Sequence, residues 1–346
     1  MSLYSVADVK QRVDHELVEY LDRKIQRAQS IDPASEQMMN EIKTFIMRGG
    51  KRLRPYLAYV SYVGSGGDGI DAFFKSAIAL EFMHNFLLVH DDIIDRDEVR
   101  YGDVNIAGAY KQRAQRIDPT HYGLSNALLA GDFEMSFAYD AVQNCSFDAQ
   151  RKLELIHMLN EAVWFTGLGE QLDFLAEDET NVTQDMLYKI HVNKTAFYSI
   201  EAPMRFGAIA AGTDISISAF AEPLGLAYQI TDDIIGMFGE QEETGKPVVS
   251  DLAEGKATIL SLHTLMHASG EDKARFQQLL GKVDANDTDL AEAREIMQRS
   301  GSLEFARTQA QQHIDRALIE LETVRLTDEA RQAIAELVAK FTNRSK

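Results

Sequence analysis

The segment from Asp71 to His90 is apolar almost all the way round a helix, and three aspartates follow it closely. A helix that is apolar on every face is normally buried in the core of a large protein. These aspartates therefore belong to the end of a buried helix rather than to a solvated run of charge. Because residues four apart share one face of a helix, Asp91 and Asp95 can point into one cavity together with Asp92.

A second acidic pair, Asp232 and Asp233, also follows a long apolar segment. If the two helices pack side by side, the carboxylates meet across a helical bundle, where such folds build metal sites. Facing carboxylates repel each other unless positive charge lies between them. Mg²⁺ prefers such hard oxygen ligands, commonly one or two carboxylates with phosphates and water. The sequence therefore predicts a magnesium-bridged phosphate site.

The rest of the chain favours an all-α fold. Helix-forming residues dominate, only six prolines are present and no long stretch alternates polar with apolar, so a sheet is not expected. No stretch in the middle of the chain looks like a linker, and we therefore expect one helical domain over residues 1–346. Expected helices cover 5–30, 34–47, 71–90, 122–144, 148–165, 183–211 and 214–238, with kinks at Pro203 and Pro223 and an amphipathic outer layer over 252–341.

Charge and cysteine content exclude several classes of protein. The net charge of −19 argues against nonspecific binding to nucleic acid or to anionic membranes. The single cysteine, Cys145, excludes a disulfide framework and fits a reducing cytosol. No signal peptide is apparent and no window approaches an uncharged transmembrane span. We therefore expect a soluble, cytoplasmic protein.

Several motifs occur together in a characteristic order. The basic run Gly49 to Pro55 comes first, then the first aspartate cluster, and the later motifs are Lys194-Thr195, Gln229 with Asp232-Asp233, Gly245-Lys246-Pro247 and Ser250 to Lys256. As an ordered set, from about residue 47 to residue 256, they resemble the trans-type polyprenyl diphosphate synthases. The resemblance implies the isoprenoid synthase type I fold, a helical bundle around a central cavity, and a homodimer.

The resemblance also implies a reaction. An allylic diphosphate ionises to a carbocation, the double bond of isopentenyl diphosphate attacks it in a 1'-4, trans condensation, and a proton is lost. Mg²⁺ held by Asp91, Asp95 and Asp232 would neutralise the departing pyrophosphate. The residues expected to carry catalysis are Asp91, Asp92, Asp95, Lys194 and Asp232.

Further residues match the family's substrate-binding positions. Lys51, Arg54 and His84 resemble the anchors for the diphosphate of isopentenyl diphosphate, with the two cations at a helix start that itself favours phosphate. Residues that resemble the allylic side are Arg100, Lys194, Thr195, Gln229, Lys246 and Lys256.

Three positions depart from the family pattern. Tyr101 replaces the second arginine of an Arg-Arg-Gly motif and supplies no charge, so Arg344 and Lys346 are candidates to compensate. Gly236 stands where the second cluster has its last aspartate, and Glu170 takes a glutamine position unless Gln171 substitutes for it. Asp173, three residues after Glu170, is a weaker metal candidate.

Product length is expected to depend on Phe86 and Met83, roughly 7.5 and 12 Å down the helix axis from Asp91 at ~1.5 Å per residue. Large side chains there resemble the pocket floor of C20-type members, although C15 is possible. Alternatives are a class I terpene cyclase, a prenyltransferase with another acceptor, or a non-catalytic subunit of a heteromeric synthase. Retention of Lys51, Arg54 and the first aspartate cluster counts against all three.

Overall fold

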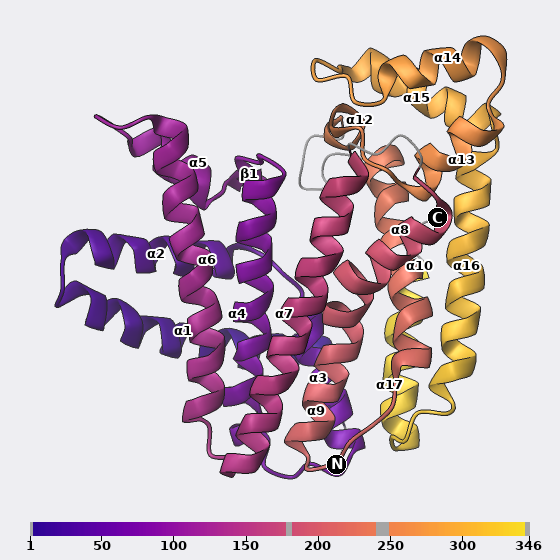
Figure 1. The fold of residues 1–346 in the computed structure, drawn as a ribbon. Helices are drawn as coiled ribbons and strands as arrows, with labels where there is room; N and C mark the ends of the chain where they lie inside the picture. The colour runs from indigo at the N-terminus through magenta and orange to yellow at the C-terminus, as the bar shows by residue number, and fades with distance from the viewer. Residues whose placement is uncertain (1–2, 178–181, 240–248, 343–346) are drawn as a thin grey trace. The chain divides into compact units, whose positions relative to one another are not determined.

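The computed structural model describes residues 3–177, 182–239 and 249–342. The chain is helical nearly from end to end (Figure 1), which confirms the predicted all-α fold. Contacts divide it into two compact units, one formed by Met1–Val163, Pro203–Ile215 and Leu326–Ala330 and the other by Trp164–Ala202, Ser216–Arg325 and Arg331–Lys346. The single domain expected from the sequence stays a prediction.

The first unit is built from the N-terminal helices. They are α1 (Val6–Gln29), α2 (Pro33–Arg48), α3 (Leu53–Gly64), α4 (Ile70–Ile94), α5 (Ile106–Arg113), α6 (Pro119–Asn144), the start of α7 (Ala149–Glu177) and most of α9 (Ala202–Ala210). A hairpin of β1 (Val99–Arg100) and β2 (Asp103–Val104) follows α4, so the expectation of no sheet is wrong by these two short strands.

The second unit takes the rest of α7 and the C-terminal helices. They are α8 (Gln184–His191), the π-helix η1 (Val192–Glu201), α10 (Ser218–Phe238), α12 (Ser250–Glu254), α13 (Ile259–His267), α14 (Gly270–Leu279), α15 (Asp287–Arg299), α16 (Ser302–Leu321) and most of α17 (Asp328–Thr342). The cluster around Ile234, Leu252 and Phe276 forms a core in this unit.

Helix α4 lies at the centre of the first unit, as its all-round apolar sequence predicts. It packs along α6 and also against α1, α3 and α2 (Figure 1). Among the described residues, α4 alone is long and apolar enough to cross a membrane by length and composition, which the sequence reading did not anticipate. Because 67% of its apolar window is buried inside the structure, α4 is accounted for as a core helix.

Several helix boundaries differ from the expected ones. Helix α7 runs on to Glu177, twelve residues beyond the expected end at residue 165. The segment expected as one helix over 183–211 is α8, η1 and α9 in succession. Helix α10 begins at Ser218, four residues later than expected. Periodicity fixed the existence of these helices better than their ends.

Helix α6 places an acidic residue in its buried face. Glu134 is 0% exposed, and neither of its carboxylate oxygens has a hydrogen-bond partner among the described residues. Burial raises the pKa of Glu134 well above its ordinary value, because an ionised carboxylate is poorly solvated inside a protein. At any pH at which an exposed glutamate is ionised, the burial of Glu134 therefore lowers the stability of the folded protein.

Replacing Glu134 with leucine is expected to stabilise the protein by about 1–3 kcal/mol at neutral pH, since the cost of a buried unsatisfied group is removed. The gain should grow as the pH rises from the ordinary carboxyl pKa of 4.5, because the unfolded wild-type chain then ionises before the folded one. Urea denaturation at pH 4.5 and 7.5 measures this. Asp132→Asn, an exposed change on the same helix, is the control, and a less stable Glu134→Leu at pH 7.5 would contradict the argument.

Candidate active site

The first aspartate cluster lies at the C-terminal end of α4. Asp91 and Asp92 occupy its last turn, and Asp95 is its C-cap residue. The negative end of the helix dipole lies here, so three carboxylates at this end are electrostatically unfavourable without a cation. One carboxylate oxygen of Asp91 and one of Asp95 lie within 4.8 Å of each other. Two oxygen donors at that separation fit a hard divalent cation such as Mg²⁺.

Arg100 brings positive charge to this cluster from the hairpin. Its Nη2 donates to Asp91 at 2.8 Å and its Nε donates to Asp92 at 2.5 Å. Tyr101 and Gly102 form the turn between the two strands, and both have positive φ, as a two-residue hairpin turn requires. The hairpin therefore holds Arg100 against Asp91 and Asp92.

The basic run Gly49 to Pro55 turns tightly between α2 and α3. Arg52 adopts the left-handed conformation, with φ of 53°, and its side chain is buried. Its guanidinium donates to Asp14 at 2.8 Å, to Glu81 at 2.7 Å and to the carbonyl of Ile46 at 2.7 Å. Arg52 thus anchors the turn, while Lys51 is exposed and Arg54 lies partly buried in the first turn of α3.

His84 and Tyr101 lie in the same unit as this turn. Burial lowers the pKa of His84 well below its ordinary value, and the charges of Arg54 and Arg100 act in the same direction. His84 is therefore neutral at physiological pH and can donate one ring N–H. The ring of Tyr101 packs on Gly49, where an added Cβ would lie 3.0 Å from the ring. Tyr101 supports the basic turn by packing.

In the second unit, Lys194 of η1 lies between two carboxylates. Its Nζ is 2.7 Å from Glu170 and 2.7 Å from Asp173, both on α7. Glu170 and Asp173 are three residues apart and so share one face of that helix. Glu170, one of the two residues expected at the glutamine position, therefore pairs with the lysine expected to bind the allylic diphosphate. Gln171 is not needed for this contact.

Close packing fixes η1 between two helices. A Cβ added to Gly169 of α7 would lie 2.3 Å from the backbone nitrogen of Lys194, and one added to Gly225 of α10 would lie 2.1 Å from the Cβ of Ala196. Only glycine permits these approaches. The π-helical stretch itself is typical of functional sites. Lys194 and Thr195 are thus held at a point where three helices meet.

A hydrogen-bonded chain runs from η1 into the distal acidic pair. The hydroxyl of Thr195 donates to Gln229 at 2.8 Å, and the amide of Gln229 donates to Asp233 at 2.9 Å. Burial raises the pKa of Asp233 to about 8, opposed by the bond from Gln229 and increased by the charge of Asp232. Asp232 is exposed. The pair therefore divides into one buried and one accessible carboxylate.

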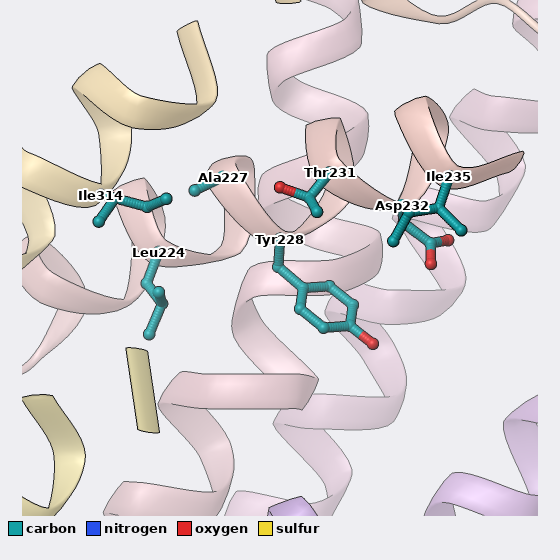
Figure 2. A pocket seen from close by; sticks show the side chains of 7 residues that line it. All are labelled: Leu224, Ala227, Tyr228, Thr231, Asp232, Ile235 and Ile314. Atoms are coloured by element: carbon teal, nitrogen blue, oxygen red, sulfur yellow. The ribbon is translucent and has the colours of Figure 1, made fainter. Parts of the chain in front are cut away.

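Asp232 borders a pocket on α10. The pocket is lined by Leu224, Ala227, Tyr228, Thr231, Asp232 and Ile235 of α10 and by Ile314 of α16. Figure 2 shows these side chains, with Asp232 and Tyr228 contributing the charged and phenolic oxygens to an otherwise mostly apolar lining.

One buried group near Lys194, the side chain of His191, was not singled out in the sequence. The pKa of His191 is lowered to about 4, mainly by burial; the charge of Asp173 opposes this shift, and the charges of Lys256 and Lys194 add to it. Asp251, in the motif that also contains Lys256, lies against Gly236. The sequence feature that could have identified His191 is its position three residues before Lys194. Lys246, Arg344 and Lys346 lie outside the described residues.

The candidate residues gather in two sets, one in each unit. The first unit brings together the first aspartate cluster with Arg100, and also holds Lys51, Arg54 and His84. The second unit brings together Lys194, Thr195, Gln229, Asp232 and Lys256. That the two aspartate clusters share one cavity stays a prediction.

Known proteins resemble this chain over most of its length. Residues 35–297 match the polyprenyl synthetase family. A short chain isoprenyl diphosphate synthase of Methanothermobacter thermautotrophicus is 34% identical over 93% of this chain and 94% of its own. A geranylgeranyl diphosphate synthase of Saccharolobus solfataricus is 31% identical over 85% of this chain and 86% of its own. The crystal structure of a geranylgeranyl pyrophosphate synthase from Corynebacterium glutamicum, complexed with isoprenyl diphosphate and magnesium, has a TM-score of 0.93 at 27% identity, covering 99% of this chain and 100% of that one.

Proposed function

Because the chain belongs to the polyprenyl synthetase family, we propose that it condenses isopentenyl diphosphate with an allylic diphosphate to a short-chain trans-polyprenyl diphosphate. It is a transferase of the prenyl diphosphate synthase type. The observation that carries the proposal is the carboxylate cluster at the end of α4, paired with Arg100 at the unfavourable end of the helix dipole. Such a cluster suits a metal-bound diphosphate.

Different residues of this chain would assist different parts of the ionisation of the allylic diphosphate. Asp91, Asp95 and Asp232 would hold Mg²⁺, which when bound neutralises the charge that builds on the departing diphosphate. Lys194 is expected to bind an allylic diphosphate oxygen, which would draw it from Glu170 and Asp173. Arg100 would move from Asp91 and Asp92 to the same diphosphate. Each interaction strengthens as the leaving group gains charge, which lowers the barrier rather than only tightening binding.

Isopentenyl diphosphate would bind at the basic turn. Lys51 and Arg54 would hold its diphosphate at the start of α3, where backbone N–H groups add to the positive field. The buried ion pairs of Arg52 position this turn. Neutral His84 would add a hydrogen bond. Tyr101 replaces a cation, so we expect weaker binding of this substrate than with arginine at that position.

We propose geranylgeranyl diphosphate, with 20 carbons, as the main product. Met83 is fully buried, and the partly buried ring of Phe86 lies 4.6 Å, centroid to centroid, from the ring of His90. Both residues precede Asp91 on α4, where a growing chain would extend away from its diphosphate. A relative that is 31% identical is named a geranylgeranyl diphosphate synthase.

Replacing Phe86 with alanine should lengthen the main product by about one or two isoprene units, because the space left by the ring admits more chain. Leu87→Ala, one residue along on another face of α4, is the matched control. Chromatography of the dephosphorylated products measures the shift. An unchanged product distribution in Phe86→Ala would show that this ring is only part of the core.

Turnover of radiolabelled isopentenyl diphosphate with C5, C10 and C15 allylic primers tests the function. We expect elongation to labelled C20 product in the presence of Mg²⁺. Consumption of primer without incorporation of label would favour a cyclase or another acceptor. Absence of both would favour a non-catalytic subunit of a heteromeric synthase.

We also propose that the protein is a cytoplasmic homodimer. Exposed apolar side chains support association on two helices. Leu128, Leu129 and Phe133 lie exposed on α6, and Trp164, Leu168, Leu172 and Leu175 recur at helical spacing on α7. Light scattering on the purified protein measures its mass, and a monomer at micromolar concentration would contradict the proposal.

A further inference from the structure

The hairpin of β1 and β2 is fastened to the end of α2 by one arginine. Arg48 is the last residue of that helix, and its side chain is 20% exposed. Its Nη1 donates to the carbonyl of Val104 at 2.6 Å, and its Nη2 lies 3.3 Å from the carboxylate of Asp103. Because a guanidinium is planar and rigid, these two contacts fix the orientation of β2 as well as its distance from α2.

A packing contact joins the same two segments. The ring of Tyr101, in the hairpin turn, packs on Gly49, the residue that follows Arg48. An added Cβ at Gly49 would lie 3.0 Å from this ring, so the approach leaves little room for any side chain. The ring also lies 6.4 Å, centroid to centroid, from the buried ring of Phe45 in α2. The hairpin is therefore attached to the end of α2 through both of its strands' connecting turn and β2.

The strand beside the one that Arg48 holds carries Arg100. Asp103, a partner of Arg48, lies directly opposite Arg100 in the antiparallel pair. On its other side Arg100 donates to Asp91 at 2.8 Å and to Asp92 at 2.5 Å. Because the two strands are hydrogen-bonded to each other, a shift of Arg100 away from these carboxylates also displaces the residue that Arg48 holds.

The basic turn begins directly after Arg48. Further along it, Arg52 is fixed by two buried ion pairs. Gly50 and Arg52 have positive φ, 97° and 53°, and a non-glycine residue in that region has few alternative conformations nearby. The backbone that carries Lys51 is therefore held on one side by Arg48 with the hairpin and on the other by Arg52.

We propose that Arg48 is a positioning residue that couples the two sets of diphosphate-binding residues in the first unit. The inference rests on the proposed function, in which Arg100 leaves Asp91 and Asp92 for the allylic diphosphate and Lys51 binds isopentenyl diphosphate. Because Arg48 joins the hairpin to the basic turn, the first ligand fixes both segments. The second ligand then binds a segment that is already ordered, which gives positive coupling. By linkage, each substrate raises the affinity for the other by the same factor.

Isothermal titration calorimetry measures this coupling without turnover. The Kd of isopentenyl diphosphate is measured in Mg²⁺ with and without a saturating, non-cleavable allylic thiodiphosphate. In the wild type the analogue should lower this Kd about tenfold, within the usual range for coupled sites. In Arg48→Ala the ratio of the two Kd values should fall to about twofold or less. Arg113→Ala, which removes an ion pair between α5 and Glu41 of α2, should keep the wild-type ratio.

Two milder variants keep the test decisive if Arg48→Ala does not fold. Asp103→Asn removes the charge of one partner and leaves the hydrogen bond to Val104, and Asp103 is 64% exposed, so the fold should be retained. Arg48→Lys keeps the charge but cannot make both contacts with one planar group. Both variants should give a ratio between those of Arg48→Ala and the wild type, with circular dichroism and Tm as checks on folding.

Either of two results would overturn the assignment. One is a wild-type ratio in Arg48→Ala, or in both milder variants, even where the separate Kd values are weaker, because Arg48 would then only stabilise the turn. The other is a ratio near one in the wild type, which would mean that no coupling exists. Failure of the proposed function is a separate outcome, since the wild type would then bind neither diphosphate.

Discussion

Replacing Asp91 with asparagine is expected to lower kcat about 1000-fold with little change in the fold. The variant keeps the size of the side chain but removes a charge that would face the proposed cation. A unit charge about 4 Å away contributes ~4 kcal/mol at an effective dielectric near 20. If that interaction is made fully only when the diphosphate departs, its loss reduces the rate by roughly three powers of ten. Initial rates at saturating substrate and several Mg²⁺ concentrations measure the effect.

Asp71→Asn is the matched control for this variant. Asp71 lies at the other end of the same helix, where its carboxylate is exposed and pairs with Arg12 at 3.2 Å. An exposed pair of this kind contributes little. The control should retain wild-type kcat, and an Asp91→Asn enzyme within tenfold of wild type would contradict the role of the first cluster.

Replacing Lys194 with alanine is expected to have an effect of similar size. Lys194 is the charge expected to meet the allylic diphosphate, and its ammonium already lies in a site shaped by Glu170 and Asp173. Removing it also leaves two carboxylates facing an anionic substrate. We therefore expect kcat to fall about 1000-fold, from the same Coulomb energy of ~4 kcal/mol. Single-turnover formation of labelled product from a C15 primer measures the ionising step.

Lys189→Ala provides the comparison, because it removes the same charge five residues earlier. Lys189 is 65% exposed and pairs with Asp185 within α8. Its loss should leave the single-turnover rate within about twofold of wild type, as for most exposed ion pairs. If both lysine variants lose activity equally, the effect comes from net charge and not from the site around η1.

Helical periodicity and the order of the motifs along the chain made much of the site predictable. The apolar segment ending in Asp91 and Asp92 had to be a buried helix, and α4 is one. Lys194, Thr195 and Gln229 were expected in one substrate-binding set, and the last two are joined by a hydrogen bond. The family resemblance supplied their expected roles, which no spacing rule alone could give.

Other features depend on tertiary contacts that no local pattern carries. By its sequence Arg52 looks like a solvated residue of a basic turn, yet its side chain is buried. It is buried because it pairs with Asp14 and Glu81, which lie on helices far away in the sequence. The π-helical turn η1 breaks the 3.6-residue period on which helix prediction rests. Glu170 lies in the part of α7 beyond residue 165, where the helix was expected to end. Its contact with Lys194 was therefore not predicted.

The absent carboxylate at Gly236 shows a third kind of limit. The sequence identified the absent side chain, but not that Asp251, fifteen residues later, lies against Gly236. Only the packing of α12 on α10 brings these two residues together.

A crystal structure with Mg²⁺ and a non-cleavable allylic thiodiphosphate tests the central claim most directly. The account predicts that both aspartate clusters converge on one diphosphate, with Asp91 and Asp95 binding cations from one side and Asp232 from the other. Lys194 should then bind a diphosphate oxygen. A diphosphate bound with metal ions that touch neither cluster, or only one of them, would contradict it.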